Sequence, residues 1–321
     1  MSKINRRLIC PSCSFSLKYY NSVSLKCTNE NCSFSKNGFR IIKNIPVVIP
    51  FFKSDCIFEE ETFSKSSNLG YKVRYKNKII LFIKKIKKLI EGNSKQTNLN
   101  FEYLTNFLPN FSQVLIIGGG SKGSGTEKFY KYCKTRDIKI ESLDIYISKN
   151  ITIVADAHYL PFPDNSFNIV IIQAVLEHVL NPQKVVSEIN RVLKNKGIVY
   201  SETPFLQSVH EGAFDFTRFT HSGHRWLFKD FKEIKSGYLN GAFSSCLFIL
   251  SYTFSAIFRN RLFGIILRVF FRRLATLLDK LIPEKYNIDL SCGCYFIGKK
   301  DSKHKSSFKA KEIKFYYSGS Q

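Results

Sequence analysis

The chain has 321 residues, of which 44% are hydrophobic and 23% are charged, and this composition excludes an intrinsically disordered protein. Its length is enough for one sizeable α/β domain and a small second module. Lysine and arginine outnumber aspartate and glutamate by 49 to 25, so the formal net charge is +24. Such a surface attracts anions such as nucleic acid, anionic lipid or phosphorylated carriers. A genome rich in lysine codons accounts for the same excess equally well, so charge alone selects no partner.

Residues 1–50 contain four of the nine cysteines, at a spacing typical of a metal site. Cys10 and Cys13 form a C-x2-C pair, Cys27 and Cys32 form a C-x4-C pair, and 13 residues separate the pairs. Four thiolates at this spacing can close a tetrahedral zinc site and replace the core that so short a module cannot build. Reduced cysteines without a metal are the alternative. The pattern therefore predicts a strand-and-turn module with a structural zinc ion, in a reducing compartment.

Residues 51–110 are expected to connect this module to the next domain. Within them, the segment Lys76–Glu91 has apolar residues at helical spacing among many lysines, which predicts a basic amphipathic helix. Such a helix could lie on an anionic membrane or on RNA, but more often it packs on its own domain.

From Gln113 onward the pattern changes to alternating strands and helices. Apolar runs predict the strands, and amphipathic stretches predict the helices between them. The expected strands are 114–119, 138–145, 151–156, 167–178 and 197–205, and the expected helices are 126–134 and 185–197. Gly197 is expected to end the second helix. This rhythm predicts a doubly wound parallel sheet.

Polar and glycine residues follow the first three strands of this predicted sheet. In a doubly wound sheet, ligands bind beyond the carboxyl ends of the strands. The glycine-rich loop Gly118–Gly125 lets the backbone approach a ligand, although such a loop alone would also suit NAD or FAD. Asp144 ends the second strand and can accept hydrogen bonds from both ribose hydroxyls, unless it only caps a helix or lies on the surface. Asp156 follows the third strand, where a carboxylate and its neighbouring N–H can read an adenine edge.

The segment ADAHYLPFPDNSFNIVIIQAVLEHVLNPQKVVSEINRVLKNKG, which begins at Ala155, resembles a known family. It is similar to the middle of the class I S-adenosylmethionine-dependent methyltransferases of the type 11 group. Their pattern is an Asp-Ala pair, Leu-Pro-Phe-Pro-Asp-x-Ser-Phe-Asp, a Leu-Glu-His strand end, and a helix with Arg-Val-Leu before a glycine turn. The resemblance implies a Rossmann-like α/β fold over residues 111–300, with a doubly wound, mostly parallel sheet of seven strands. The cysteine module would be a small zinc-ribbon-like addition.

The resemblance also implies how S-adenosylmethionine binds. Seven residues should contact it. Gly118 and Gly120 should line its methionine end, and Asp144 should bind the ribose. Asp156 and Ala157 should flank the adenine, and Gln173 and Ala174 should face the sulfonium. The family's first motif, Val-Leu-Asp-x-Gly-x-Gly-x-Gly, is altered here, because Ile116 replaces the acid and Lys122 replaces the third glycine. A non-catalytic binding protein that keeps the fold is the alternative that these departures suggest.

Residues 203–228, after the fifth strand, are rich in histidine, aromatic and charged side chains, as expected of a substrate-binding loop. They resemble a subgroup with the pattern Pro-Phe-x-Gln-x-x-His and Asp-(Phe/Tyr)-x-Arg-(Phe/Tyr)-Thr, which is associated with surface-polysaccharide biosynthesis. An oxygen or nitrogen acceptor can need a base. His210 and Asp215 are the catalytic candidates and His178 is a third, although each could have only a structural role. Arg218 could bind an anionic substrate group or pair with Asp215.

Residues 241–282 are predicted to form two apolar and basic helices, inserted before the last strand. The uncharged run 242–258 is at the lower edge of a membrane-spanning length, and arginines follow it. The pattern favours helices that cap the sheet, then helices that lie in a membrane interface, and least of all a spanning helix. The last strand is expected at 292–300, and residues 301–321 should form a polar tail.

Together these features predict a methyltransferase that methylates an oxygen of a glycan or other small-molecule acceptor, which a lipid carrier could hold at the membrane. An rRNA or tRNA methyltransferase is the alternative, since the charge would suit RNA. Against it, the sequence Gln173-Ala174-Val175-Leu176 is not of the Asn-Pro-Pro-Tyr type that serves planar nitrogens. The basic N-terminus lacks an apolar stretch, so no signal peptide is evident. A cytoplasmic location is expected, with peripheral membrane contact through residues 241–282.

Overall fold

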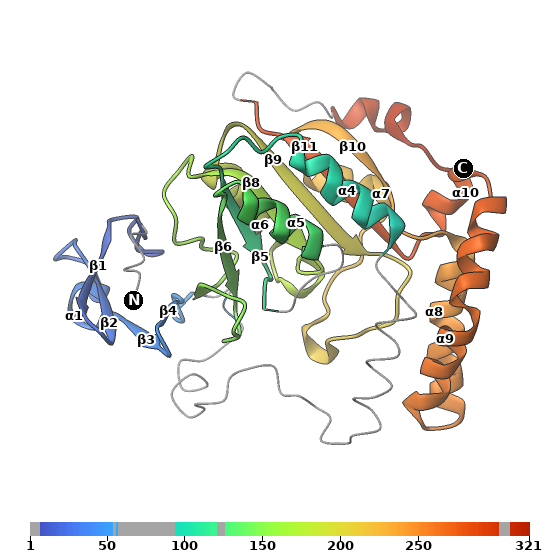
Figure 1. Ribbon diagram of the computed structural model, residues 1–321, viewed down its shortest axis with the longest axis horizontal. Coiled ribbons are helices and arrows are strands. Elements are labelled where there is room, and N and C mark those ends of the chain that lie inside the picture. The colour runs from blue at the N-terminus through green and yellow to red at the C-terminus, as the bar shows by residue number, and fades with distance from the viewer. Residues whose placement is uncertain (1–6, 54–55, 57–93, 121–125, 302–308) are drawn as a thin grey trace.

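A computed structural model describes residues 7–53, 56, 94–120, 126–301 and 309–321. The basic helix expected at Lys76–Glu91 lies outside these residues. The strands among them form one mixed sheet of eleven strands, in the order β1-β2-β3-β4-β7-β6-β5-β8-β9-β11-β10 (Figure 1).

The centre of this sheet is parallel and doubly wound, as the sequence predicted. Its parallel strands, in spatial order, are β7 (Ile153–Ala155), β6 (Lys139–Asp144), β5 (Gln113–Ile117), β8 (Phe167–Gln173) and β9 (Leu193–Pro204). Two antiparallel strands complete that end of the sheet: β11 (Gly293–Lys299) pairs with β9, and β10 (Lys232–Tyr238) pairs with β11. No apolar run in the sequence indicated β10, because the strand is mostly polar and lies at the edge of the sheet.

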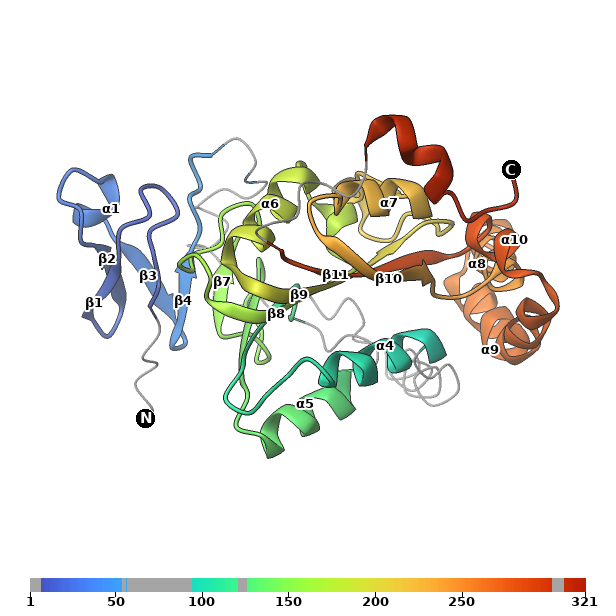
Figure 2. The same cartoon turned by 90° about the horizontal axis from the view of Figure 1, so that it is seen from above.

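Helices cover both faces of the central sheet (Figure 2). One face carries α4 (Lys95–Thr105) and α5 (Thr126–Thr135), and the other carries α6 (Pro182–Val192) and α7 (His221–Leu227). The alternation of side chains along β5 explains why both faces are apolar. Val114 and Ile116 belong to the core that contains Phe101 of α4, whereas Leu115 and Ile117 belong to the core on the opposite face. Ile116 therefore stands at a core position.

The cysteine module extends the central sheet and does not stand apart from it. It consists of β1 (Leu17–Asn21), β2 (Ser24–Cys27), α1 (Ser33–Lys36), β3 (Phe39–Ile42) and β4 (Ile45–Val48). β4 pairs in parallel with β7, with Val47 opposite Val154 and Val48 opposite Ala155. The expectation of seven strands is therefore wrong. The apolar strand β4 covers the edge of β7, whose unpaired N–H and C=O groups would otherwise be exposed.

The helix expected at 185–197 ends earlier than the sequence predicted. α6 ends at Val192, and β9 begins at Leu193, so the chain becomes a strand before it reaches Gly197. Leu193 is fully buried and pairs with Phe167 of β8, which fixes it as extended backbone. Gly197 lies within an irregularity in this pairing, between Leu193 and Ile198, where an added Cβ would meet the carbonyl oxygen of Lys194 at 2.8 Å. Long-range pairing here outweighs the helical pattern of the sequence.

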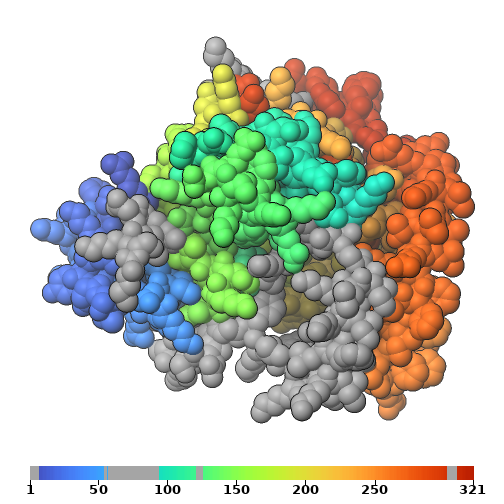
Figure 3. Space-filling view, in the orientation of Figure 1, coloured from blue at the N-terminus to red at the C-terminus, as the bar shows by residue number. Residues whose placement is uncertain are grey.

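The two helices expected within 241–282 are present as α8 (Ala242–Ile257) and α9 (Arg261–Leu278). They form a hairpin at the end of the molecule opposite the cysteine module, and α10 (Glu284–Asp289) leads from it back to β11 (Figures 1 and 3). The hairpin covers neither face of the sheet, which corrects the favoured expectation of a cap. Its buried residues are few and small, so most of its large apolar side chains stay exposed. Within the part of the chain that is described, no helix combines the length and apolarity needed to cross a bilayer.

Candidate functional site

A cavity of about 380 Å³ opens at the carboxyl ends of β5, β6, β7 and β8. This is the edge at which doubly wound sheets bind ligands. Six of the seven residues expected to hold the cofactor line it: Gly118, Asp144, Asp156, Ala157, Gln173 and Ala174. Gly120 does not line the cavity but donates its backbone N–H to Asp144 Oδ2 over 2.9 Å.

Two glycines of the loop after β5 cannot be replaced without a clash. Gly118 has a φ of +79°, and an added Cβ would lie 2.3 Å from Cγ2 of Val175. At Gly120 an added Cβ would lie 2.5 Å from Asp144 Oδ2. Residues 118–120 therefore lie directly against β6 and the end of β8, as a backbone that lines a nucleotide pocket must.

Asp144, at the end of β6, is a fixed hydrogen-bond acceptor. Its Oδ1 accepts the backbone N–H of Tyr146 over 3.0 Å, and its Oδ2 accepts that of Gly120. Burial raises the pKa of this carboxyl, and the two backbone hydrogen bonds counter that rise. The carboxylate is thus oriented before any ligand arrives, so little ordering entropy remains to be lost on binding.

Asp156, after β7, forms a buried pair with His158 that the sequence did not reveal. Asp156 Oδ1 lies 2.6 Å from His158 Nδ1 and accepts the backbone N–H of His158 over 2.9 Å. His158 Nε2 accepts the backbone N–H of Asn181, so the proton of the neutral ring is on Nδ1 and is donated to Asp156. This pair holds the Asp156 carboxylate at the cavity wall.

Glu202, near the end of β9, also lines the cavity, and sequence reasoning missed it. Its Oε2 accepts Nε2 of Gln173 over 2.8 Å, and its Oε1 accepts the Thr97 hydroxyl of α4 over 2.7 Å and also the Tyr200 hydroxyl. Burial raises the pKa of Glu202, and these hydrogen bonds counter the rise. The network fixes the side chain of Gln173. No local pattern could indicate it, because its members come from α4, β8 and β9.

The three catalytic candidates lie together at one side of the cavity. His178, in the short 3-10 turn Leu176–His178 after β8, and His210, on the loop after β9, both line the cavity. Asp215 does not line it; its Oδ2 lies 3.4 Å from His210 Nδ1. Arg218 pairs with both oxygens of Asp215, which is one of the two roles expected for it.

Neighbouring charged side chains shift the pKa values of His210 and Asp215 in opposite directions. The Glu177 carboxylate, which the sequence pattern did not single out, raises the pKa of His210. Burial would raise the pKa of Asp215, but the Arg218 guanidinium outweighs it and lowers this pKa to about 2. Asp215 is therefore an ionised carboxylate beside His210 at neutral pH.

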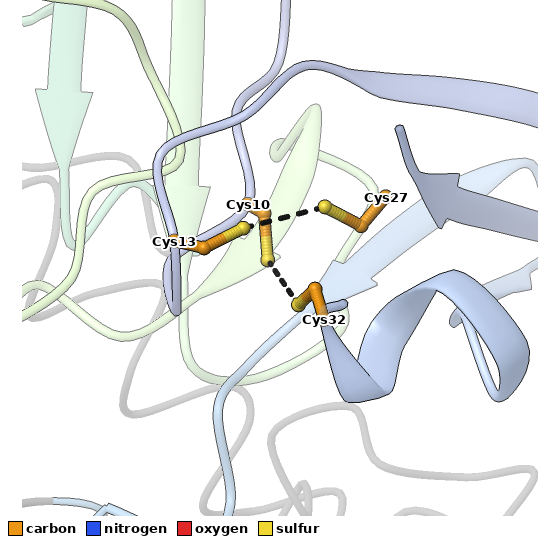
Figure 4. A group of neighbouring side chains, drawn as sticks. All are labelled: Cys10, Cys13, Cys27 and Cys32. Atoms are coloured by element: carbon orange, nitrogen blue, oxygen red, sulfur yellow. Dashed lines mark hydrogen bonds between the residues drawn. The ribbon is translucent and has the colours of Figure 1, made fainter. Parts of the chain in front are cut away.

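The four cysteines of the N-terminal module converge on one point (Figure 4). Their sulfur atoms all lie within 4.8 Å of one another, with Cys10 and Cys32 3.8 Å apart and Cys13 and Cys27 3.4 Å apart. Around a tetrahedral zinc ion with Zn–S bonds of about 2.3 Å, sulfurs lie about 3.8 Å apart. The sulfur positions therefore fit a closed zinc site with four cysteine ligands.

Comparison with known families identifies the central segment of the chain. A family model described as a methyltransferase domain matches residues 115–201, which run from β5 into β9. Residues 115–201 are therefore similar to a methyltransferase domain, and most of the residues that line the cavity lie among them.

Two curated proteins of Methanocaldococcus jannaschii, both uncharacterized, are similar to part of the chain. One is 41% identical over 80 residues and the other 38% identical over 79 residues, each covering 23% of this chain. The matches cover 35% and 38% of those proteins, so the chain spans little more than a third of their length.

Solved structures with a similar fold include two N-methyltransferases. The phosphoethanolamine N-methyltransferase 2 of Haemonchus contortus has a TM-score of 0.44 at 18% identity, covering 68% of this chain and 56% of that one. A coclaurine N-methyltransferase has a TM-score of 0.39 at 12% identity, covering 64% of this chain and 72% of that one.

Proposed function

We propose that this protein is an S-adenosylmethionine-dependent methyltransferase that methylates an oxygen of a glycan or another small-molecule acceptor. One observation carries the cofactor assignment: within the matched methyltransferase domain, the fixed Asp144 carboxylate and the close-packed Gly118 loop line a single cavity at the carboxyl ends of the strands. When bound, the cofactor supplies a methyl group that its sulfonium has already activated.

The cavity residues suit the successive parts of the cofactor. Asp144 would accept the ribose hydroxyls, and Asp156 with the N–H of Ala157 would read the adenine edge. Gly118 would lie against the methionine moiety. Gln173 and Ala174 would face the sulfonium. We assign the methionine ammonium to the carboxylate of Glu202, because the family's usual acid is absent at Ile116 and Glu202 is a further carboxylate at the cavity wall, beside Gln173.

The acceptor would enter beside His178 and His210. These side chains are 20% and 41% exposed, and both line the cavity, so they are reachable from solvent and from the cofactor. Methyl transfer is an in-line displacement, so the chain has mainly to hold the acceptor in line with the methyl group and to handle the acceptor's proton. A histidine and carboxylate cluster suits a hydroxyl acceptor, whose proton must leave.

A test of the acceptor class uses transfer of labelled methyl groups. The full chain, incubated with labelled S-adenosylmethionine and a lipid extract of the cells that carry the gene, is expected to label lipid-linked material. Acid hydrolysis of that material should release a methyl ether of a sugar. Label in total RNA from the same cells, with none in the lipid extract, would overturn the glycan proposal in favour of RNA methylation. Label on an amine would overturn the oxygen acceptor.

We propose further that the α8–α9 hairpin contacts an anionic membrane surface. Along α9, Phe270 is 78% exposed and Leu277 is 57% exposed, and they lie two helical turns apart on one side. Arg259, Arg261 and Arg273 are exposed on the same hairpin. Apolar side chains flanked by arginines are typical of helices that lie in a membrane interface, where a lipid-linked acceptor would be found.

Vesicle flotation checks this surface. The wild-type chain should float with vesicles that contain phosphatidylglycerol and not with pure phosphatidylcholine. Phe270→Glu combined with Leu277→Glu should weaken binding about 10-fold or more, because each buried apolar side chain contributes about 1.5–3 kcal/mol. Phe315→Glu is the matched control, since Phe315 is 75% exposed but lies outside the hairpin. Equal flotation of all three proteins would remove the hairpin from the membrane contact.

We propose a structural role for zinc at the cysteine cluster. Burial raises the pKa of Cys10 and raises that of Cys27 to about 11, so without a metal both are protonated thiols at neutral pH. Four sulfur ligands fill a tetrahedral shell and leave no open position for a substrate. The ion would therefore hold β1–β4 together and brace β4 against β7.

A further inference from the structure

A second group of ligand atoms converges beside the cofactor cavity. His178 Nε2 and His210 Nε2 lie 3.1 Å apart, and Glu177 Oε1 lies 3.5 Å from the first and 3.7 Å from the second. Three vertices of a tetrahedral shell, with metal–ligand bonds of about 2.0–2.1 Å, lie about 3.3–3.4 Å apart. The triangle formed by these three atoms therefore has the size of a metal site.

The two imidazoles have acceptor oxygens near their outer nitrogens, and their Nε2 atoms face each other. His178 Nδ1 lies 2.7 Å from the carbonyl oxygen of Phe214, which can only accept, so this nitrogen carries the proton. His210 Nδ1 lies 3.4 Å from Asp215 Oδ2. With a ring proton on each outer nitrogen, both Nε2 atoms can act as ligands. Such partners on the far nitrogen are what histidine ligands of metals usually have.

Glu177 adds a buried negative charge to this point. The residue is fully buried, and neither of its carboxylate oxygens has a hydrogen-bond partner among the described residues. Leaving a carboxylate buried and unpaired costs several kcal/mol. The fold nevertheless holds it there, because the backbone oxygen of Glu177 accepts the N–H of Phe216 over 2.8 Å, which ties the loop after β9 to the end of β8. Two imidazole nitrogens and a carboxylate that face one another would be stabilised by a cation between them.

We propose that Glu177, His178 and His210 bind a divalent first-row transition-metal ion at the acceptor side of the cavity. Two imidazoles and one carboxylate with an open position are the ligand set of catalytic zinc and of non-heme iron sites. His178 and His210 line the cavity, so the open position faces it. In this assignment the two histidines are ligands and neither is the base.

The site would take an oxygen of the acceptor, and this part of the inference rests on the proposed methyltransferase function. A hydroxyl at the open position ionises more readily beside a divalent cation, and its proton leaves to water. The oxygen's electron pair then forms the bond to the methyl carbon while the carbon–sulfur bond breaks and leaves its electrons on sulfur. The ion thus selects acceptors that offer a hydroxyl, or a hydroxyl with a neighbouring oxygen, over amines.

Cobalt(II) titration of the full chain loaded with one equivalent of zinc tests the site, because the four thiolates take up that zinc and leave the second site free. Calorimetry should show one further equivalent of Co²⁺, and the cobalt absorption should lack a sulfur charge-transfer band. Glu177→Gln and His210→Ala should each weaken this binding at least about 100-fold, since loss of outer-shell partners alone costs about 10–100-fold. His210 lies on an exposed loop, so its variant keeps the test valid if Glu177→Gln does not fold. Asp230→Asn, at an exposed acid away from the cavity, is the charge-matched control.

The outcomes distinguish the proposed metal site from the proposed methyltransferase function. No further equivalent of Co²⁺ in the wild type, or equal binding by both site variants, would overturn the metal site and leave a proton shared between the two imidazoles. S-adenosylhomocysteine binding by the metal-free cavity, measured in the same instrument, reports on the cofactor alone. Cobalt binding without S-adenosylhomocysteine binding would overturn the proposed function and keep the metal site.

Discussion

Asp144→Ala is expected to weaken the binding of S-adenosylhomocysteine about 100-fold or more. The wild-type carboxylate is held by the N–H groups of Gly120 and Tyr146 and is half-buried at the cavity wall. A hydrogen bond to a charged group contributes about 1.5–3 kcal/mol, and two ribose hydroxyls would lose this acceptor together. Isothermal titration calorimetry measures the effect directly.

The control for this prediction is at the other end of the same strand. Asp137 is exposed just before β6, and Asp137→Asn should leave the affinity unchanged, since asparagine tolerates the positive φ of 51° found there. Circular dichroism of both variants checks that the fold is kept. An Asp144→Ala protein that is folded and binds S-adenosylhomocysteine as tightly as the wild type would remove the cavity as the cofactor site.

Cys10→Ser combined with Cys13→Ser is expected to abolish zinc binding by the N-terminal module. Structural zinc sites contribute about 10–16 kcal/mol to the folding of small modules, and the module has few other means of holding its strands. We expect the zinc content to fall from about one ion per chain to none, and limited proteolysis to cut within residues 7–53. Plasma emission spectrometry and mass spectrometry of the fragments provide the two measurements.

The zinc content of the cysteine cluster must be measured in a protein whose proposed second metal site is disabled. The cysteine variants are therefore made in the Glu177→Gln background, which removes one ligand of the proposed site beside the cavity. Cys246→Ser is the matched control, because Cys246 is exposed on α8, away from the cluster. Retention of one tightly bound zinc ion by the double variant would show that the four cysteines do not bind it.

Loss of the zinc ion should also disturb the wall of the cofactor cavity. β4 pairs with β7, and Asp156 and Ala157, which follow β7 directly, line the cavity. Leu8 and Cys10 of the module share a hydrophobic core with Leu160, a few residues further on. The module therefore supports the adenine side of the predicted cofactor site from the edge of the sheet.

Local patterns in the sequence were enough to predict the parallel centre of the sheet and several residues of the cavity wall. A buried parallel strand is a continuous apolar run, so β5 and β8 could be recognised from composition alone. Because the carboxyl ends of parallel strands meet at one edge, Asp144 and Asp156 could be placed together from their positions at strand ends, and the family resemblance added Gln173. The close spacing of the four cysteines within one short segment likewise predicted that their sulfur atoms converge.

Only the tertiary structure decided the features that depend on contacts between distant segments. The attachment of β4 to β7, the early start of β9 at Leu193 and the contact of Glu202 with Thr97 all result from pairing or packing across the sheet. The cluster of Glu177 and His178 with His210 is of the same kind. Its members are brought together because the loop after β9 folds back onto the end of β8, and the N–H of Phe216 binds the backbone oxygen of Glu177. A sequence pattern records which side chains lie at the end of a strand, but the path of a loop back across the sheet decides which of them meet.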